Sequence, residues 1–543
     1  MTQTIQKKLN DFAWARWSAM VLIALMMLFA HMFVDVISPL QEVIQKTHGW
    51  MPSTYGTFAS SEYLLNVCGF LIIAGFILDK MGIRFTGITS AIVMIIGASI
   101  KFYAVSDWFA GSALEGWLNS WWVDMPGSAK LASLGFMIFG CGVEMAGITA
   151  SKALAKWFEG KEMALAMGLE MALARVGVFF IFTISPRLAG EFNPSVVKPV
   201  GFCLALLTIG LLCYAIFCLM DKKFDKQLGA NAAQGESEEE FKFADVVNIF
   251  KSKLFWIVAM LCVLYYSAIF PFQKFATNML QSNLGLSTRE ASDIFRWFPI
   301  GAACITPLLG WYLDKKGKGA TMLMLGSILM IVCHLTFAFI LPECRSEVIA
   351  YAAIITLGVS FSLVPASLWP SIPKIMDKRF LGSAYSLIFW IQNIGLWLIP
   401  NVIGLSLEAT NPGVQDNINT VKIEISNNVS AITNVKEIPE NVEVAIEDVA
   451  YQIATGCKAE PTTVTNAIDL VAEDMGNITP ETLEKITTSI NYTAANTVAT
   501  PYNYTTPMLI FAFLGVLALL FSLWLKALDK RKGYGLELPN IKE

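Results

Sequence analysis

Charged side chains lie inside long apolar stretches of this chain, where their role must be pairing or the handling of a charged solute. The segment from Glu162 to Ser185 is apolar from Met163 onward, except for Glu170 and Arg175. The apolar stretch before it contains Glu144. A charge near the centre of a bilayer costs about 2.5–3.5 kcal/mol on insertion scales, so it is normally paired or lines a water-filled path.

The sequence offers little support for other chemistry. It contains no glycine-rich phosphate-binding loop and no cluster of metal-ligating residues, so we expect no cofactor, no metal, no ATP-driven step and no enzymatic activity. The ten cysteines are scattered without a C-x-x-C pair, and we interpret them as small buried hydrophobes. The basic residues follow membrane topology, so we expect no nucleic-acid partner.

The composition indicates a protein that crosses the lipid bilayer many times. Of the 543 residues, 55% are hydrophobic and only 15% are charged, and the apolar residues form long blocks. A spanning helix needs about 20 apolar residues. We predict an all-α membrane protein with twelve spans in two pseudo-symmetric six-helix bundles, centred on 17–37, 55–78, 85–103, 131–151, 162–185, 199–220, 254–275, 289–313, 319–340, 347–368, 381–404 and 507–527.

Basic residues predict the orientation. Clusters such as Lys80 with Arg84, or Lys315 with Lys316, fall on one side, which the positive-inside rule makes cytoplasmic together with both termini. The expected organisation is a first bundle over 1–220, a cytoplasmic linker over 221–250, helices 7–11 over 251–404, a non-cytoplasmic insert over 405–505, a twelfth helix over 506–527 and a cytoplasmic tail over 528–543.

The insert is a second soluble feature of the chain. Residues 405–505 contain 14 acidic and 4 basic residues, a net charge of −10. Polar and apolar residues alternate in "VKIEIS", from Val421 to Ser426, and helical patterns follow at Glu440–Ala454 and Pro480–Ile490. We expect a small folded cap.

A motif repeats in corresponding positions of the two halves. "GFILDKMG" from Gly75 and "GWYLDKKG" from Gly310 both read G-x-x-x-D-K-x-G, and both end an even-numbered span. Two such matches indicate a parallel structural repeat. The first glycine could let two helices pack closely, and the aspartate could bridge to a neighbouring helix in one conformation only; alternatively it only anchors the turn. The expected gating residues are Asp79, Lys80, Arg84, Asp314 and Lys315.

This architecture and motif resemble the major facilitator superfamily over all twelve spans. Four stretches, "KWFEGKEMALAMGLEMALARVG", "LCVLYYSAIFPF", "ASLWPSIP" and "LGSAYSLIFWIQNIGL", are similar to its vertebrate lysosomal dipeptide transporters. The resemblance implies alternating access, dipeptide uniport and an accessory glycoprotein on the luminal side. The long insert and the lack of an acidic dileucine signal depart from that group. We therefore expect the protein to lie in a cell inner membrane, or in the lysosomal membrane if the source is eukaryotic. We also expect it to be a monomer.

The resemblance also implies a substrate site. It places Glu144 and Arg175 there, with Glu144 binding the peptide ammonium and the planar fork of Arg175 binding the carboxylate. Without substrate the two could neutralise each other, or they could form only a fold-holding pair. At 1.5 Å per residue, Glu144 lies about 10 Å and Arg175 about 20 Å from the cytoplasmic ends of their spans, so direct pairing is not assured. We expect Glu170 to face the cytoplasmic vestibule or a polar helix contact.

Further polar and aromatic side chains inside the spans are candidate binding residues, each with packing as the alternative role. They are Asp35, Tyr63, Tyr265, Tyr266, Lys274, Arg296, Trp369, Gln392 and Asn393. His31 and His334 are more simply explained as packing residues. Two other functions stay open. One is a proton-coupled symporter of organic anions, with Asp35, Glu62 or Glu144 as proton carrier. The other is a receptor or scaffold that works through the insert.

Overall fold

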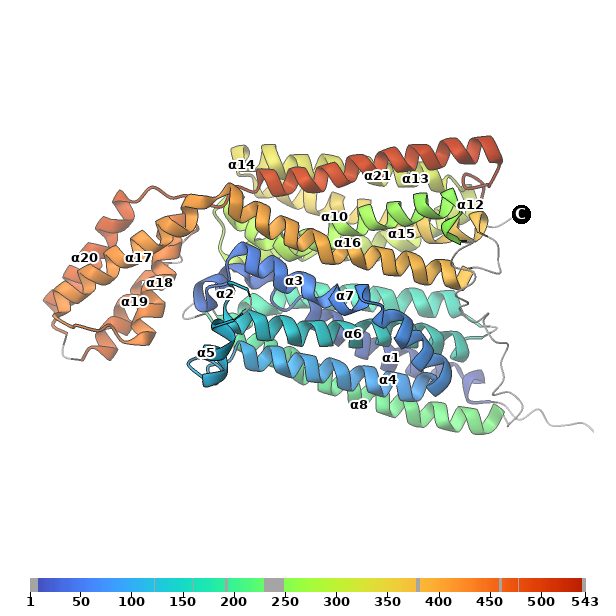
Figure 1. Cartoon of the computed structure of the whole chain (residues 1–543), viewed down its shortest axis with the longest axis horizontal. Helices are drawn as coiled ribbons and strands as arrows, with labels where there is room; N and C mark the ends of the chain where they lie inside the picture. Colours follow the sequence, from blue (N-terminus) through green and yellow to red (C-terminus); the bar gives the residue numbers. More distant parts are fainter. Residues whose placement is uncertain are drawn as a thin grey trace, which may run out of the picture.

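The computed structural model describes residues 8–121, 123–159, 161–190, 194–228, 249–376, 381–458, 461–476 and 478–539, with the side chains of 164, 307, 314, 381–383 and 461–463 left out. In these ranges the regular structure is helical throughout. Long helices run side by side and the insert projects from one end (Figure 1). We call that end the insert end, and the opposite one, where the described residues begin and end, the terminal end. Most of the expected linker, 229–248, lies outside the described residues.

The first half of the bundle runs from α1 to α8. Its helices are η1 Leu9–Asp11, α1 Ala13–Val34, η2 Ser38–Leu40, α2 Gln41–His48, α3 Pro52–Val67, α4 Phe70–Ala104, α5 Ala113–Asn119, α6 Gly127–Trp157, α7 Met163–Ala189 and α8 Val197–Leu228. The predicted second span falls on α3 and the first part of α4, which Gly69 separates with a left-handed φ of 100°.

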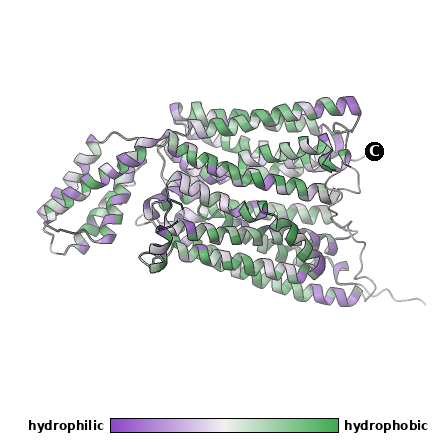
Figure 2. Cartoon of the chain, viewed as in Figure 1, coloured by the Kyte–Doolittle hydropathy of each residue, from purple (hydrophilic) through white to green (hydrophobic). Residues whose placement is uncertain are grey.

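The second half runs from α10 to α16 and is completed by α21. Its helices are α10 Lys253–Leu284, α11 Thr288–Phe295, α12 Trp297–Lys316, α13 Gly319–Leu335, the π-helical turn Thr336–Ile340, α14 Leu341–Cys344, α15 Glu347–Ile375, α16 Leu381–Thr410 and α21 Thr505–Lys532. Across the described ranges, 11 helices are long and apolar enough to cross a membrane. Hydrophobic residues follow the bundle helices, and hydrophilic ones gather at its ends and on the insert (Figure 2).

The insert is a group of four helices. They are α17 Pro412–Thr433, α18 Glu440–Thr455, α19 Pro461–Asp474 and α20 Pro480–Asn496, of which α18 and α20 match the two predicted helical segments. The alternation in "VKIEIS" does not mark a strand, because this segment lies within α17. The helical period explains this: Val414, Ile418, Val421, Ile425 and Val429, three or four residues apart, are all buried.

Two glycines allow the halves to meet closely near the insert end. A Cβ added at Gly56 of α3 would collide with the Pro400 carbonyl of α16, and one added at Gly404 of α16 would collide with the Pro52 carbonyl. Small residues at such crossings let helix backbones approach closely in a membrane. The α3–α16 crossing is therefore a tight seam between the halves.

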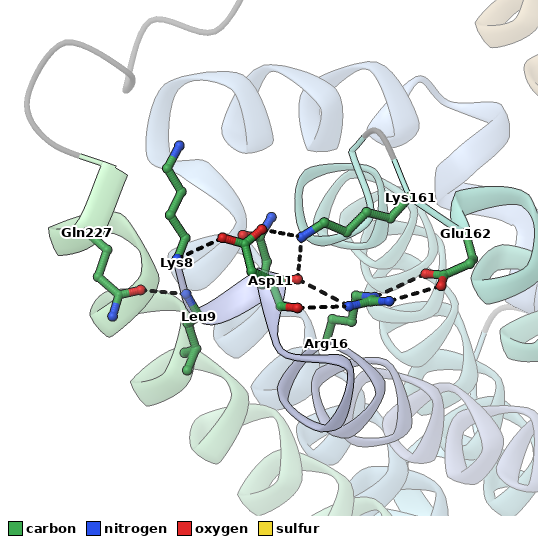
Figure 3. Close-up of polar contacts among 8 residues, drawn as sticks. Lys8, Leu9, Asp11, Arg16, Lys161, Glu162 and Gln227 are labelled. Carbon is green, nitrogen blue, oxygen red and sulfur yellow. Dashed lines mark hydrogen bonds and ion pairs between the residues drawn. The ribbon is translucent and has the colours of Figure 1, made fainter. Parts of the chain in front are cut away.

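At the terminal end, polar contacts fix the start of the chain to the first half (Figure 3). Arg16 donates to both carboxylate oxygens of Glu162, at 2.9 and 3.1 Å, and Lys161 donates to Asp11 at 2.8 Å. These bonds lower the pKa of Asp11 and of Glu162, mainly through Lys161 and Arg16 respectively. A carboxylate with a lowered pKa stabilises the fold above its ordinary pKa and loses that contribution as the pH falls.

The repeated motif ends in a glycine of positive φ in both halves. Its last glycine has a positive φ in each copy, 74° at Gly82 and 71° at Gly317, and each divides two long helices. The first glycine has another role than predicted, since a Cβ added at Gly75 or Gly310 would meet nothing within 4 Å. In this conformation the motif is a turn signal and the first glycine does not mediate close helix packing.

We predict that Gly82→Ala destabilises the protein and that Gly75→Ala does not. An alanine at position 82 would have to adopt a φ of 74° with a ψ of 172°, a backbone conformation confined essentially to glycine, which costs about 1–3 kcal/mol. At position 75, inside a helix and in open space, alanine is favoured over glycine by about 1 kcal/mol. Thermal unfolding of the purified variants should separate them in opposite directions from the parent. Equal midpoints would contradict the assigned role of Gly82.

Candidate functional site

A buried ion cluster joins the two halves near the insert end. Asp35 at the end of α1 and Glu62 on α3 belong to the first half, and Lys274 on α10 belongs to the second. The three residues are only 2%, 5% and 5% exposed. The Lys274 ammonium lies 3.1 Å from Asp35 Oδ1 and 3.6 Å from Glu62 Oε2. Buried charges are usually paired in this way, because an uncompensated buried charge is strongly destabilising.

Neighbouring hydrogen bonds complete this cluster. Asp35 accepts from Gln273 Nε2 at 2.5 Å and from the Ser38 hydroxyl at 3.0 Å. Lys274 also donates to the Val34 carbonyl at 3.0 Å. Sequence reasoning missed Gln273, although a Gln–Lys pair within an apolar helix was the available signal. Asp35 and Lys274, predicted as separate binding residues, are thus partners across the interface.

Arg175 and Glu144, the two principal site candidates, do not pair with each other. In the described part of the chain neither has an oppositely charged group within ion-pair distance. Arg175 lies instead between two rings of the second half, with its guanidinium carbon 5.3 Å from the Phe270 centroid and 5.2 Å from that of Phe361. The mutual neutralisation that the resemblance left open is therefore absent from the ion pairs of the described residues in this conformation.

Tyr63 interacts electrostatically with both of these charges, since its hydroxyl is within electrostatic range of Glu144 and of Arg175. Glu170 also interacts with Arg175 electrostatically, and His31 turns its Nδ1 to the Met27 carbonyl at 2.8 Å. The middle of the first half thus presents one guanidinium and two carboxylates that lack direct ion partners among the described residues.

Aromatic side chains of the second half surround Arg175 from the other side. Tyr266 packs on Phe270 and Phe361, and its hydroxyl accepts a hydrogen bond from Trp369 Nε1 at 3.2 Å. The Tyr385 hydroxyl donates to the Trp369 carbonyl at 3.3 Å. Two of the predicted aromatic candidates, Tyr266 and Trp369, are therefore brought together opposite Arg175.

Four predicted site residues lie elsewhere. Tyr265 is buried and its hydroxyl bonds to Ser327 and the Leu323 carbonyl of α13, because it points about 100° around α10 from Tyr266. Arg296 pairs with Asp293 at 2.8 Å beside the Arg187–Asp293 ion pair. Gln392 and Asn393 are almost fully buried; Gln392 accepts from Cys262 at 3.1 Å and Asn393 donates to the Phe389 carbonyl at 2.9 Å. In this conformation the four side chains are thus held by polar contacts to neighbouring protein groups.

A second polar network joins the insert to both halves. Lys46 of α2 pairs with Asp448 of the insert at 2.6 Å and with Glu42 at 2.5 Å. Glu42 in turn accepts from Thr288 at 2.9 Å and from Gln281, both in the second half. Sequence reasoning found none of these partners, since their proximity depends on how the insert folds back.

The predicted gating residues pair within their own half. Asp79 contacts Lys152 of α6 at 2.5 Å, with both side chains well exposed. Arg84 lies 2.9 Å from Asp225 and 3.5 Å from the buried Asp221 of α8. Lys80 is exposed and Lys315 lies over the Trp311 ring at 4.8 Å, while the Asp314 side chain lies outside the described residues. The latch role of Asp79 and Asp314 stays a prediction.

Comparison with known proteins agrees with this geometry. A family model described as Major Facilitator Superfamily matches residues 23–400. The chain belongs to the major facilitator superfamily. Among curated proteins it is similar to the lysosomal dipeptide transporter MFSD1 of Danio rerio, 28% identical over 345 residues that cover 62% of this chain and 68% of the relative. The same transporter of Homo sapiens is 27% identical over 346 residues, with 62% and 68% covered.

Solved structures show the same superfamily fold. The nucleoside transporter NupG has a TM-score of 0.57 at 13% identity, covering 94% of this chain and 98% of its own. A bacterial homologue of the human lysosomal transporter Spinster, in an inward-facing and occupied conformation, has a TM-score of 0.56 at 15% identity, with 93% and 96% covered. The superfamily is one of transporters and is not an enzyme class.

We predict that Lys274→Met opens the insert end. The change leaves two buried carboxylates without their cation, and removing one partner of a buried pair commonly costs about 3–5 kcal/mol. The insert-end-closed state should lose population, which spin labels at the exposed positions Trp108 and Val348, one in each half, would report as a longer distance. Lys156→Met is the control, because its partners Asp221 and Asp225 belong to the same half and keep Arg84 as a partner. An unchanged distance in Lys274→Met would show that the cluster does not hold this end closed.

Proposed function

We propose that this protein moves dipeptides across a membrane by alternating access, as a uniporter. The relatives named lysosomal dipeptide transporters support the substrate class. Within the protein, the carrying observation is the pair of charges without ion partners in the described residues, Arg175 and Glu144. A zwitterionic dipeptide supplies a carboxylate for the first and an ammonium for the second, which satisfies both.

The position of Arg175 suits this role. A guanidinium held between the Phe270 and Phe361 rings keeps its planar fork free to make two parallel hydrogen bonds to a carboxylate. The rings belong to the second half and Arg175 to the first, so a bound peptide would contact both. Tyr63, Tyr266 and Trp369 are the polar and aromatic residues that we assign to the rest of the site.

The distribution of contacts supports an access route. The ion cluster of Asp35, Glu62 and Lys274 and the glycine crossing of α3 and α16 join the halves near the insert end. We propose that this conformation is closed there and loads or releases peptide through the terminal end, with Asp79 and Asp314 as latches in the opposite state. The insert covers the closed end and takes the place of a separate accessory protein.

The membrane arrangement completes the proposal. We assign twelve spans in two six-helix bundles, with α3 and the first part of α4 together forming the second span. Both termini lie in the cytoplasm of a cell with this protein in its inner membrane, following the basic clusters, or face the cytosol from a lysosomal membrane. The protein works as a monomer.

Capped peptides test the assignment of the two charges. A C-terminally amidated dipeptide should lose most of its affinity for the parent protein and much less for Arg175→Ala, because the partner is already absent. Losing a buried charged partner commonly costs about 2–5 kcal/mol. Binding measured by thermal shift or calorimetry gives the coupling as a double-mutant cycle.

An N-acetylated peptide with Glu144→Gln is the matched second cycle, and Arg296→Ala with the amidated peptide is the control. Arg296 should show no coupling, since Asp293 already pairs with it. If amidation weakens the parent protein and Arg175→Ala equally, Arg175 does not bind the carboxylate and the proposed site is wrong.

The alternative is a proton-coupled symporter of organic anions, favoured by the buried carboxylates Asp35 and Glu62. The two functions differ in the effect of a pH gradient on flux into proteoliposomes. Uniport predicts that dipeptide accumulates only to the external concentration, with or without a gradient. Accumulation above that level, driven by the gradient and abolished by an uncoupler, would establish the alternative.

A further inference from the structure

One buried cation has no role in the site described so far. Lys101, in the last turn of α4, is 0% exposed, and its ammonium has no hydrogen-bond partner among the described residues. Three rings surround it: the centroid of Phe136 lies 4.2 Å from the nitrogen, that of Phe33 4.6 Å and that of Phe58 5.0 Å. We call these rings the aromatic cage.

Tight packing of α4 against α6 produces this burial. A Cβ added at Gly135 of α6 would meet the Lys101 backbone nitrogen, and one added at Gly97 of α4 would meet the Gly135 carbonyl. The glycines bring the helices close enough to shut Lys101 away from solvent. A lysine in the last turn of a helix is favoured by the helix dipole, but the dipole alone does not explain why the ammonium is enclosed by rings.

Lys101 borders the ion cluster at the closed end. The Phe136 ring that covers it also lies 5.5 Å from the Lys274 nitrogen. The titratable groups that face Lys101 are Lys274 of α10, Glu62 of α3, Cys203 of α8 and Asp35 at the end of α1. Glu62 in turn faces Lys274, Asp35, Lys101, Tyr63 and Glu144, and its Oε2 also lacks a hydrogen-bond partner in the described chain.

A charge count shows what opening of the insert end would require. In the closed state two carboxylates, Asp35 and Glu62, face two ammonium groups, Lys274 and Lys101. When the halves separate, Lys274 leaves with the second half. The first half then keeps two negative charges, and Lys101 is the one cation in this group that stays with them.

We propose that Lys101 is a positioning residue that leaves its aromatic cage and pairs with Glu62 when Lys274 withdraws. Glu62 thereby regains a cation from within the first half and needs no proton when the insert end opens, while Asp35 keeps its hydrogen bond from the Ser38 hydroxyl. This inference rests on the proposed alternating access, and it gives the proposed uniport a physical basis in this chain.

The test follows the insert end directly and uses no substrate. The full-length protein, labelled at positions 108 and 348 and placed in lipid nanodiscs, gives the open and closed populations by pulsed spin-label distances at about pH 5.5 and about pH 7.5. For the parent protein we expect the open-to-closed ratio to change less than about twofold over this range. In Lys101→Met, opening should require a proton on Glu62, so the ratio should rise by up to about tenfold for each unit that the pH falls.

Two further variants separate this role from simple packing. Lys101→Arg keeps the charge and should keep the pH-independent ratio. Adding Glu62→Gln to Lys101→Met removes the carboxylate that needs the proton and should abolish the pH dependence. A pH-independent Lys101→Met, or a dependence that survives Glu62→Gln, would overturn the proposal.

A cage variant provides the test if Lys101→Met does not fold. Phe136→Leu removes one ring from the ammonium and should raise the open population by up to about thirtyfold, the effect expected for one desolvated cation–π contact. Phe139→Leu is the matched control, since this ring packs on Phe33 and does not contact the ammonium. Equal effects of the two leucine variants would overturn the proposal. If the spin-label distance between positions 108 and 348 of the parent protein stays at one value, even with peptide added, alternating access itself would be refuted.

Discussion

The structure depends on how a few charges are neutralised inside a bundle of apolar helices. Lys274 is the central case, because it comes from one half and its two carboxylate partners, Asp35 and Glu62, come from the other. With all three side chains almost fully buried, the halves cannot separate here without leaving charges unpaired. In the proposed account this requirement holds the insert end closed, and the glycine crossing of α3 and α16 permits the close approach that the cluster needs.

Arg175 and Glu144 differ from the charges of the Lys274 cluster. In the described residues they lack oppositely charged partners, so their pairing is left to something that enters the bundle. The charges near the insert end are thus paired with other protein groups, whereas the charges in the middle of the bundle are not. This arrangement suits an alternating-access transporter, because charges paired within the protein can hold a gate closed and charges without ion partners can bind the substrate.

Sequence reasoning identified the charged residues better than their partners. Apolar blocks interrupted by Glu144, Arg175 and Lys274 were visible directly, and the repeated motif located the turns at Gly82 and Gly317. The pairing of Lys274 with Asp35 could not be predicted, because it depends on which residues of distant helices face each other. Likewise, the sequence does not show how α10 is rotated about its axis, and this rotation determines that Tyr266, and not Tyr265, faces Arg175.

The insert shows the same limit in another form. Its helical segments at α18 and α20 were predictable from periodicity, but six alternating residues in α17 resembled a strand. The longer pattern from Val414 to Val429 has the helical period, and only a window of several turns reveals it. The buried contact of Lys46 with Asp448 had no signal in the local sequence, since it joins residues 402 positions apart.

A structure of the protein with a bound dipeptide, determined by electron cryomicroscopy in nanodiscs, tests the account most directly. We expect the peptide carboxylate within hydrogen-bond distance of Arg175 and its ammonium at Glu144, with the Lys274 cluster intact whenever the insert end is closed. A peptide bound elsewhere, with Arg175 and Glu144 paired to protein groups, would contradict the account.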